Sequence, residues 1–247
     1  MKHYIHRVEL LRDEVPDFGV YPFCLDAVRE LTALELHPNV SFFVGENGSG
    51  KSTLLEAIAV AWGFNAEGGS RNVHFDTRRS HSPLHEYLRL SRGVSRPRDG
   101  YFLRAESFFN VATHIEQLDE EWAPEPKVIE AYGGRSLHEQ SHGESFMALL
   151  LQRFSGRSLF ILDEPEAALS PTRQMALLSR MHQLVGEGSQ FVIATHSPLV
   201  MAYPDAIIFA LGEEGIRQID YEETEHFQIT RRFLNDPQRM LRDLLDS

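Results

Sequence analysis

The sequence predicts an α/β fold with a mainly parallel sheet that is covered by helices on both faces. Short apolar runs typical of buried strands recur at 40–45, 158–163 and 190–195. Segments with helical spacing alternate with these runs. Strands that alternate with helices pair in parallel, and a parallel sheet needs cover on both faces.

Each element follows from its local pattern. Strands are expected where apolar residues run together or alternate, and helices where they recur with the helical period. Proline and glycine mark the loops and turns. In chain order we expect a strand at 3–10, a loop at 12–22, a strand at 40–45, a helix at 52–64, a strand at 101–105, a connection at 119–136, a strand at 158–163, a helix at 172–188, a strand at 190–195, a hairpin at 206–220 and a helical tail at 228–247.

The composition narrows the class of protein. The 247 residues carry a formal net charge of -12, which argues against a protein that simply coats nucleic acid, because phosphate binding needs a basic surface. The stretch 77–99 is basic, and a solvated surface excursion is favoured there over a local basic patch. Cys24 is the single cysteine, and no apolar run approaches the length of a membrane span. We expect a cytoplasmic protein without membrane insertion.

The segment "GENGSGKS", Gly45 to Ser52, fits the phosphate-loop pattern and stands between a predicted strand and a predicted helix. Glycines let successive backbone N–H groups point at phosphate oxygens, and the helix adds its positive end. Lys51 can reach the β- and γ-phosphates, and the Ser52 hydroxyl can ligate Mg²⁺. The residues predicted to bind nucleotide here are Glu46, Asn47, Gly48, Ser49, Gly50, Lys51, Ser52 and Thr53.

Two more polar groups follow buried strands. In "LFILDEPE", Asp163 ends a strand and can hold Mg²⁺ through water, while Glu164 is placed to activate a water molecule as a general base. In "FVIATHSP", His196 follows the next strand. Because ligands of open α/β sheets bind at the carboxyl ends of the strands, we expect His196 to reach a γ-phosphate. The predicted catalytic residues are Glu164, His196 and Lys51.

The segment "SHGES", residues 141–145, has two interpretations. Ser141 followed by Glu144 fits a capping box, so an ordinary helix start is favoured on these residues alone. The capped end of a helix is also a place where phosphate binds.

The phosphate loop, "SHGES", "LDEPEAALSP" and "ATHSP", in this order, resemble the ATP-binding-cassette (ABC) ATPases, and most closely their SMC-, RecF- and OLD-like branch. The resemblance implies a P-loop NTPase fold with an N-terminal antiparallel β portion and a small helical insertion. It also implies an ATPase that uses ATP and Mg²⁺. We expect one ABC-type domain over 1–247, with a helical signature subregion at about 107–155.

The resemblance also implies a homodimer that forms head-to-tail around two Mg-ATP. In these families the serine and second glycine of the signature motif contact the nucleotide held by the other head, and Ser141 and Gly143 match them by position. His142 and Glu144 depart from the usual glycine and glutamine. Glu106 stands where relatives place a metal-binding glutamine, and a helix-starting acid is its equal alternative.

The chain resembles a stand-alone head. The stretch 107–140 lacks the heptads of a coiled coil, and about 40 residues after the hairpin are too few for a nuclease domain. The leading hypothesis is an ATP-driven switch with an unidentified protein effector. The alternatives are the ATP-binding subunit of an ABC transporter and an ATP-dependent DNA-associated protein of repair or defence, so a nucleic-acid partner stays undecided.

Overall fold

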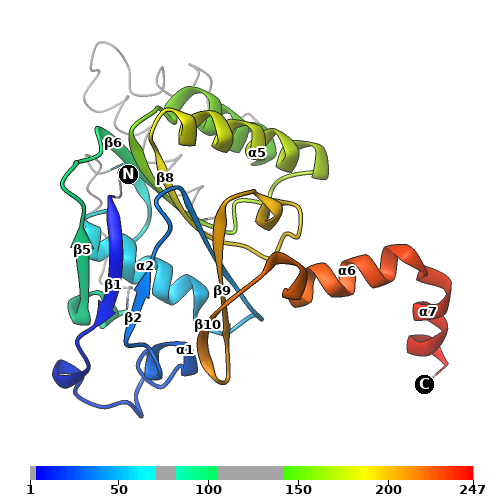
Figure 1. Cartoon of the computed structure of the whole chain (residues 1–247), viewed down its shortest axis with the longest axis horizontal. Coiled ribbons are helices and arrows are strands. Elements are labelled where there is room, and N and C mark those ends of the chain that lie inside the picture. Colours follow the sequence, from blue (N-terminus) through cyan, green and yellow to red (C-terminus); the bar gives the residue numbers. More distant parts are fainter. Residues whose placement is uncertain (1–3, 71–81, 105–141, 247) are drawn as a thin grey trace.

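A computed structural model describes residues 4–70, 82–104 and 142–246 of the chain. Its main sheet has seven strands in the order β10-β9-β3-β8-β7-β6-β4, and the five strands from β9 to β6 are parallel (Figure 1). The two outer strands, β10 and β4, pair antiparallel to their neighbours. The strands are β3 (Val40–Val44), β4 (Gly69–Ser70), β6 (Asp99–Arg104), β7 (Ser158–Asp163), β8 (Gln190–Ala194), β9 (Ala206–Gly212) and β10 (Gly215–Ile219). The predicted fold class is therefore confirmed.

A second sheet of three antiparallel strands has the order β2-β1-β5. It consists of β1 (Ile5–Leu10), β2 (Ala33–Glu35) and β5 (Leu88–Arg92). The sequence predicted β1, but the interpretation of 77–99 as a surface excursion is wrong for β5. Leu88 is buried and Leu90 packs against the core, whereas Arg89 and Arg92 are exposed, and these arginines make the stretch look solvated.

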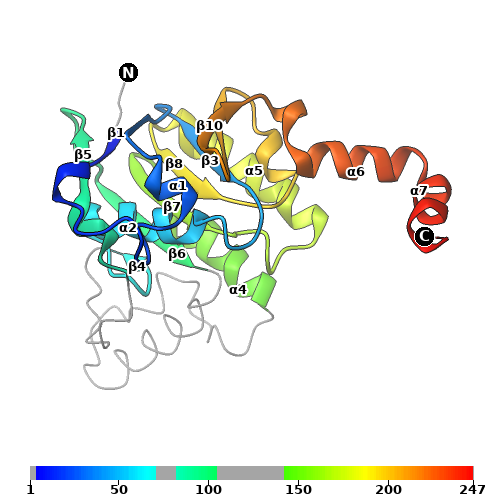
Figure 2. The ribbon, with the colours of Figure 1, turned by 90° about the horizontal axis from the view of Figure 1, so that it is seen from below.

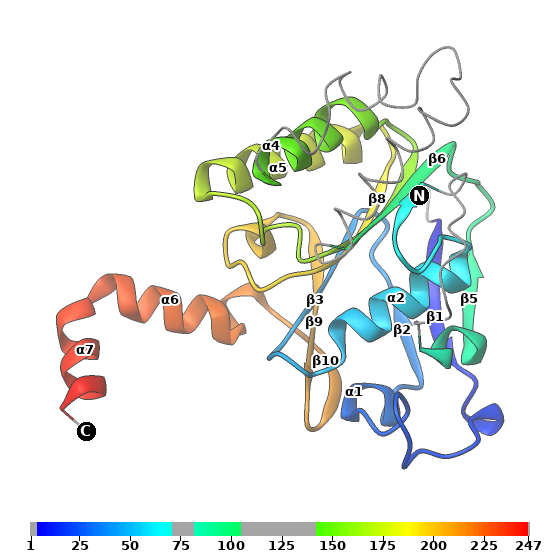
Figure 3. The ribbon, with the colours of Figure 1, turned by 180° about the vertical axis from the view of Figure 1, so that it is seen from behind.

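Helices cover both faces of the main sheet (Figure 3). α2 (Lys51–Trp62) lies between the two sheets and shares one apolar cluster with them. On the opposite face, α4 (His142–Ala148), the π-helical turn η5 (Leu149–Arg153) and α5 (Pro171–Gly186) pack in a second cluster. α4 and η5 lie within the stretch 107–155 expected to be a signature subregion, and the part of that stretch at 107–141 lies outside the described residues. The shorter elements are η1 (Arg12–Glu14), α1 (Asp26–Arg29), η2 (Pro83–Tyr87), η6 (Val200–Ala202) and η7 (Tyr221–Glu223).

The core divides along the pleat of the main sheet. In β3, Phe43 belongs to the cluster on the α2 side, whereas Phe42 and Val44 belong to the cluster on the α5 side. All five residues of β3 and all five of β8 are buried. A strand buried on both faces has no polar side, which is why these strands appear in the sequence as continuous apolar runs.

The helical tail consists of α6 (Glu225–Asn235) and α7 (Pro237–Leu245), which extend away from the rest of the molecule (Figures 1 and 2). α6 begins three residues before the predicted start, where the Thr224 hydroxyl accepts a hydrogen bond from Phe227 N and caps the helix. Asp236 separates the two helices, and Pro237 is the first residue of α7. Among the helices of the described ranges, none is long and apolar enough to cross a membrane.

Gln190 joins the two sheets from a fully buried position at the start of β8. Its Oε1 accepts hydrogen bonds from Tyr4 N at 3.0 Å and Ile5 N at 2.9 Å. Its Nε2 donates to Ile5 O at 2.8 Å and His37 O at 3.0 Å. One amide side chain therefore satisfies four backbone groups at the junction of the sheets.

We expect Gln190→Leu to lower the free energy of unfolding by about 4 kcal/mol or more, because each buried polar group left without a partner costs roughly 1–3 kcal/mol. Urea denaturation followed by circular dichroism measures this loss. Gln218→Leu, at an exposed position of β10, is the matched control and should change stability by less than about 1 kcal/mol. Equal losses in the two variants would contradict the role of Gln190.

Candidate functional site

The three predicted parts of the site meet at one edge of the main sheet. β3, β8 and β7 are parallel neighbours, so their carboxyl ends lie side by side. The loop 45–50 follows β3, His196 follows β8, and Glu164 follows β7. His196 is therefore at the end of the middle strand, between the loop and the two carboxylates. Parallel pairing brings together residues that are more than 100 positions apart in the sequence.

The loop between β3 and α2 requires glycine at two points. Gly45 has a φ of 147°, and a Cβ there would collide with the carbonyl oxygen of Leu211 on the neighbouring strand β9. Gly50 has a φ of 94° and is the N-cap of α2. L-residues with side chains are strained in such conformations, so glycine permits the tight curl that turns backbone N–H groups inward.

Lys51 is 4% exposed, and its ammonium group lies over the loop. Its Nζ donates hydrogen bonds to Gly45 O at 2.9 Å and to Glu46 O at 2.8 Å. Burial lowers the pKa of Lys51 below its ordinary value of 10.5. The carboxylates of Glu164, Asp163 and Glu166 act in the opposite direction. The three carboxylates thus offset part of the effect of burial on the pKa of Lys51.

Ser52 and Asp163 are in direct contact. Ser52 Oγ donates a hydrogen bond to Asp163 Oδ1 at 3.0 Å, and Asp163 is 6% exposed. A hydroxyl and a carboxylate are oxygen ligands of the kind that Mg²⁺ prefers, so the pair fits a magnesium ion completed by water and phosphate oxygens. No cluster of three His, Cys, Asp or Glu side chains that could hold a metal is present in the part of the chain that is described. Glu106, the third predicted metal ligand, lies outside the described residues.

Glu164 has a strained backbone. Its φ of 50° places it in the left-handed region, and its N–H donates to Ala194 O on β8 at 2.9 Å. Its Oε1 lies 3.4 Å from His196 Nε2. Non-glycine residues in this conformation persist where the surrounding structure holds them, and they gather at functional sites. In this backbone conformation, the Glu164 side chain at the end of β7 lies next to His196.

His196 has one nitrogen with a partner and one without. Its Nδ1 lies 3.0 Å from Nε2 of His226, at the start of α6. Its Nε2 is buried and has no hydrogen-bond partner among the residues described. His226 was not predicted, because one histidine among twelve, between the expected hairpin and the expected helical tail, carries no local signal.

Glu166 is a second residue that the sequence analysis did not single out. Its Oε1 accepts hydrogen bonds from His196 N at 2.6 Å and Ser197 N at 3.2 Å. The carboxylate therefore fixes the backbone of the segment that carries His196. The sequence signal that could have identified Glu166 was its position in "DEPE", two residues after Glu164.

Gly143 lies apart from these residues, at the start of α4. A Cβ at Gly143 would lie 2.7 Å from Ala168 O and would also collide with the guanidinium of Arg173. Arg173 Nη2 is 3.8 Å from Glu144 Oε1. The second half of "SHGES" thus packs against the segment that follows Glu164 and against α5, while Ser141 lies outside the described residues.

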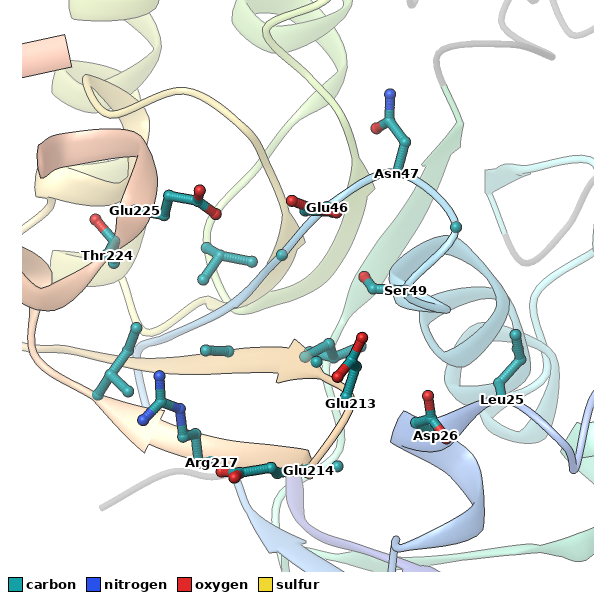
Figure 4. A pocket seen from close by; sticks show the side chains of 18 of the residues that line it. Leu25, Asp26, Glu46, Asn47, Ser49, Glu213, Glu214, Arg217, Thr224 and Glu225 are labelled. Atoms are coloured by element: carbon teal, nitrogen blue, oxygen red, sulfur yellow. The ribbon is translucent and has the colours of Figure 1, made fainter. Parts of the chain in front are cut away.

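A cavity of about 750 Å³ adjoins the other side of the loop (Figure 4). The loop residues Glu46, Asn47 and Ser49 line one wall, and the β9–β10 turn with Glu213 and Glu214 lines another. The start of α6 closes it with Thr224, Glu225 and His226. Most of the charged side chains in the lining are carboxylates, and Lys51, Ser52, Asp163 and Glu164 are not part of it, so we expect a triphosphate on the side of the loop where those four residues lie.

An aromatic ring can stack on adenine, and Tyr4, Tyr21 and Phe23 are aromatic residues of the N-terminal part of the chain. Tyr4 is 1% exposed and Phe23 is 3% exposed, so both are core residues. Tyr21 is 57% exposed, and its Oη lies 3.2 Å from Thr53 Oγ1 in the first turn of α2.

Two protein-family models match the chain. One, described as "AAA domain", matches residues 18–117, and the other, described as "AAA domain, putative AbiEii toxin, Type IV TA system", matches residues 128–202. The chain is also 65% identical over 26 residues to the DNA replication and repair protein RecF of Colwellia psychrerythraea strain 34H. This match spans 10% of the chain and only 7% of the length of that relative.

The fold resembles solved ATP-binding cassettes. The structure titled "An inward-facing conformation of a putative metal-chelate type ABC transporter" matches with a TM-score of 0.52 and 15% identity, over 92% of this chain and 88% of the other. A nucleotide-free ATP-binding cassette from an ABC transporter matches with a TM-score of 0.51 and 17% identity, over 95% and 96%.

The fold therefore resembles that of ABC-type P-loop ATPases. The AAA-domain matches and the RecF segment agree with the resemblance to RecF-like ATPases that the motifs predict.

Proposed function

We propose that the protein binds Mg-ATP at the loop 45–52 and hydrolyses it to ADP and phosphate. The observation that carries this proposal is the hydrogen bond between Ser52 Oγ and Asp163 Oδ1. These are the two side chains that a phosphate-loop site needs for Mg²⁺, and they come from elements 111 positions apart in the sequence. The general base and the histidine of the predicted site lie at the same edge of the sheet.

Nucleotide binding uses groups that are already close together. The loop N–H groups and the positive end of α2 accept the β- and γ-phosphates. Lys51 exchanges its contacts with Gly45 O and Glu46 O for phosphate oxygens. Ser52 and Asp163 hold Mg²⁺, which when bound neutralises charge on the phosphates during transfer.

Hydrolysis depends on Glu164 and His196. Glu164 orients a water molecule and accepts its proton as the water oxygen attacks the γ-phosphorus. The new bond from water to phosphorus forms as the bond from phosphorus to the ADP oxygen breaks. His196 presents Nε2 from a water-poor position towards the terminal phosphate, where a donor stabilises the charge on the transferred group.

We further propose that two copies form a head-to-tail dimer around two Mg-ATP, in which Ser141 and Gly143 of one copy contact the phosphate held by the other. Within one monomer, Gly143 packs against Ala168 O and Arg173, which places the start of α4 beside the segment that follows Glu164. Loss of the γ-phosphate would remove the contact and separate the heads, which makes the dimer a switch.

Ser141→Arg tests the contact between the two copies. We expect the variant to bind ATP as the parent does and to remain monomeric with ATP and Mg²⁺, because a large cation replaces a small donor at the interface. Light scattering after gel filtration measures the mass, and Ser95→Arg, at an exposed loop position, is the control. Gly143 is less suitable, since any side chain there would collide within its own monomer. An unchanged ATP-dependent dimer would support the helix-cap interpretation instead.

A DNA-associated role is the second candidate, because the matched relative is a DNA replication and repair protein. Because the net charge is -12, DNA binding would need a local basic surface. Binding of labelled duplex DNA by the ATP-loaded protein at two salt concentrations decides the question, since phosphate contacts weaken steeply as salt rises.

A further inference from the structure

The start of α6 supplies a side chain to the site from outside the three strand ends. His226 is the second residue of α6, and its Nε2 lies 3.0 Å from His196 Nδ1. Two contacts hold this segment in place. Tyr221 Oη donates to Pro198 O at 2.8 Å, two residues beyond His196, and Thr224 caps the helix. Figure 4 shows Thr224 and Glu225 at the edge of the cavity, across from Glu46 of the loop.

The short distance between the two imidazoles requires one nitrogen to donate and the other to accept. A neutral imidazole carries its proton on only one of its two nitrogens. If His196 donated from Nδ1, its Nε2 would present a lone pair to Glu164 Oε1 at 3.4 Å. The buried Nε2 lone pair would then face a second acceptor, the half-buried carboxylate of Glu164, which costs energy. If His226 donates instead, His196 carries its proton on Nε2, facing the carboxylate.

The charges around His226 agree with a neutral donor. Burial is the main cause that lowers the pKa of His226 below its ordinary value of 6.5. His196 and Lys51 lower it further, and Glu225 raises it. A lowered pKa favours a neutral ring, which carries one proton and can donate it from Nε2 to His196.

We propose that His226 is a positioning residue that fixes His196 in the tautomer with its proton on Nε2, so that a hydrogen-bond donor faces the terminal phosphate. The effect of this tautomer on hydrolysis rests on the proposed ATPase function. The tautomer itself can be tested without hydrolysis. The contact also makes the tautomer of His196 depend on the position of α6.

Nitrogen-15 NMR of the imidazole side chains tests the tautomer directly in the full chain without nucleotide. The two tautomers differ in which ring nitrogen carries the pyrrole-type shift, and a His196→Gln spectrum assigns the signals. We expect the parent to show the proton of His196 on Nε2. We expect His226→Gln to keep it there, because the glutamine amide donates to Nδ1 from the same place.

His226→Glu is the matched opposite variant, since its carboxylate accepts a hydrogen bond where glutamine donates one. We expect a proton on Nδ1 of His196 in this variant. We also expect kcat to fall at least about 10-fold in His226→Glu and to stay within about 3-fold of the parent in His226→Gln, with similar affinity for ATP. Circular dichroism confirms that both variants fold.

The two readouts separate the possible failures. A parent with its proton on Nδ1, or a folded His226→Glu variant whose His196 Nδ1 stays unprotonated, overturns the inference whatever the ATPase activity. Equal kcat values in the two variants also overturn it. Absence of ATP hydrolysis in the parent, together with the expected NMR result, overturns the proposed function and leaves the assigned tautomer standing.

Discussion

Glu164→Gln is expected to bind ATP, to hydrolyse it at least about 100-fold more slowly than the parent and to accumulate ATP-bound dimers. A general base contributes about 10²- to 10⁴-fold to such a reaction, and an amide cannot accept the proton from water. Glutamine has the same shape and keeps the backbone contact from residue 164 to Ala194 O. Phosphate release measures turnover, and light scattering measures the dimer.

Glu213→Gln is the matched control for the slower hydrolysis expected in Glu164→Gln. Glu213 is an exposed carboxylate that lines the cavity on the other side of the loop. The same change there should leave hydrolysis within about 2-fold of the parent, because Glu213 follows β9 and lines the cavity, away from the ends of β7 and β8 that carry Glu164 and His196. Hydrolysis at the parent rate by Glu164→Gln would show that another group activates the water.

Lys51→Ala is expected to weaken ATP binding about 100-fold and to remove measurable turnover. Hydrogen bonds to a charged group contribute roughly 1.5–3 kcal/mol each, so the loss of one or two phosphate contacts gives a change of this size. The Lys51 ammonium now contacts only loop carbonyls in the described structure, so its loss should affect nucleotide more than folding. Fluorescent ATP titration measures affinity, and thermal unfolding checks stability.

Arg217→Ala is the control for the loss of a positive charge. Arg217 is exposed and lines the cavity beside Glu214 (Figure 4). We expect its affinity for ATP to stay within about 3-fold of the parent. If Arg217→Ala weakened binding more than Lys51→Ala, the triphosphate would lie in the cavity instead of the loop.

The sequence was sufficient to predict the part of the fold that carries the proposed site. β3, β7 and β8 are buried on both faces, so their apolar runs were visible, and the polar residues that follow them marked the strand ends. Parallel pairing then places those ends together without further information. The contact between Ser52 and Asp163 could therefore be expected from pattern and topology alone.

Other features depend on tertiary contacts that no local pattern reveals. β5 is an edge strand whose arginines suggested a surface segment, and β2 has three residues, too few for a visible period. His226 reaches the site only because Tyr221 anchors the start of α6 beside Pro198. In the sequence, Glu166 is one more acid of the "DEPE" segment. Only the structure shows that its carboxylate accepts a hydrogen bond from the backbone N–H of His196.

A crystal structure of the protein with Mg²⁺ and a non-hydrolysable ATP analogue tests the central claim most directly. The account predicts β- and γ-phosphates enclosed by residues 45–52, with Lys51 on their oxygens and Mg²⁺ between Ser52 and Asp163. Glu164 and His196 should face the terminal phosphate. Phosphates bound in the acidic cavity, or at any place out of reach of these five side chains, would contradict it.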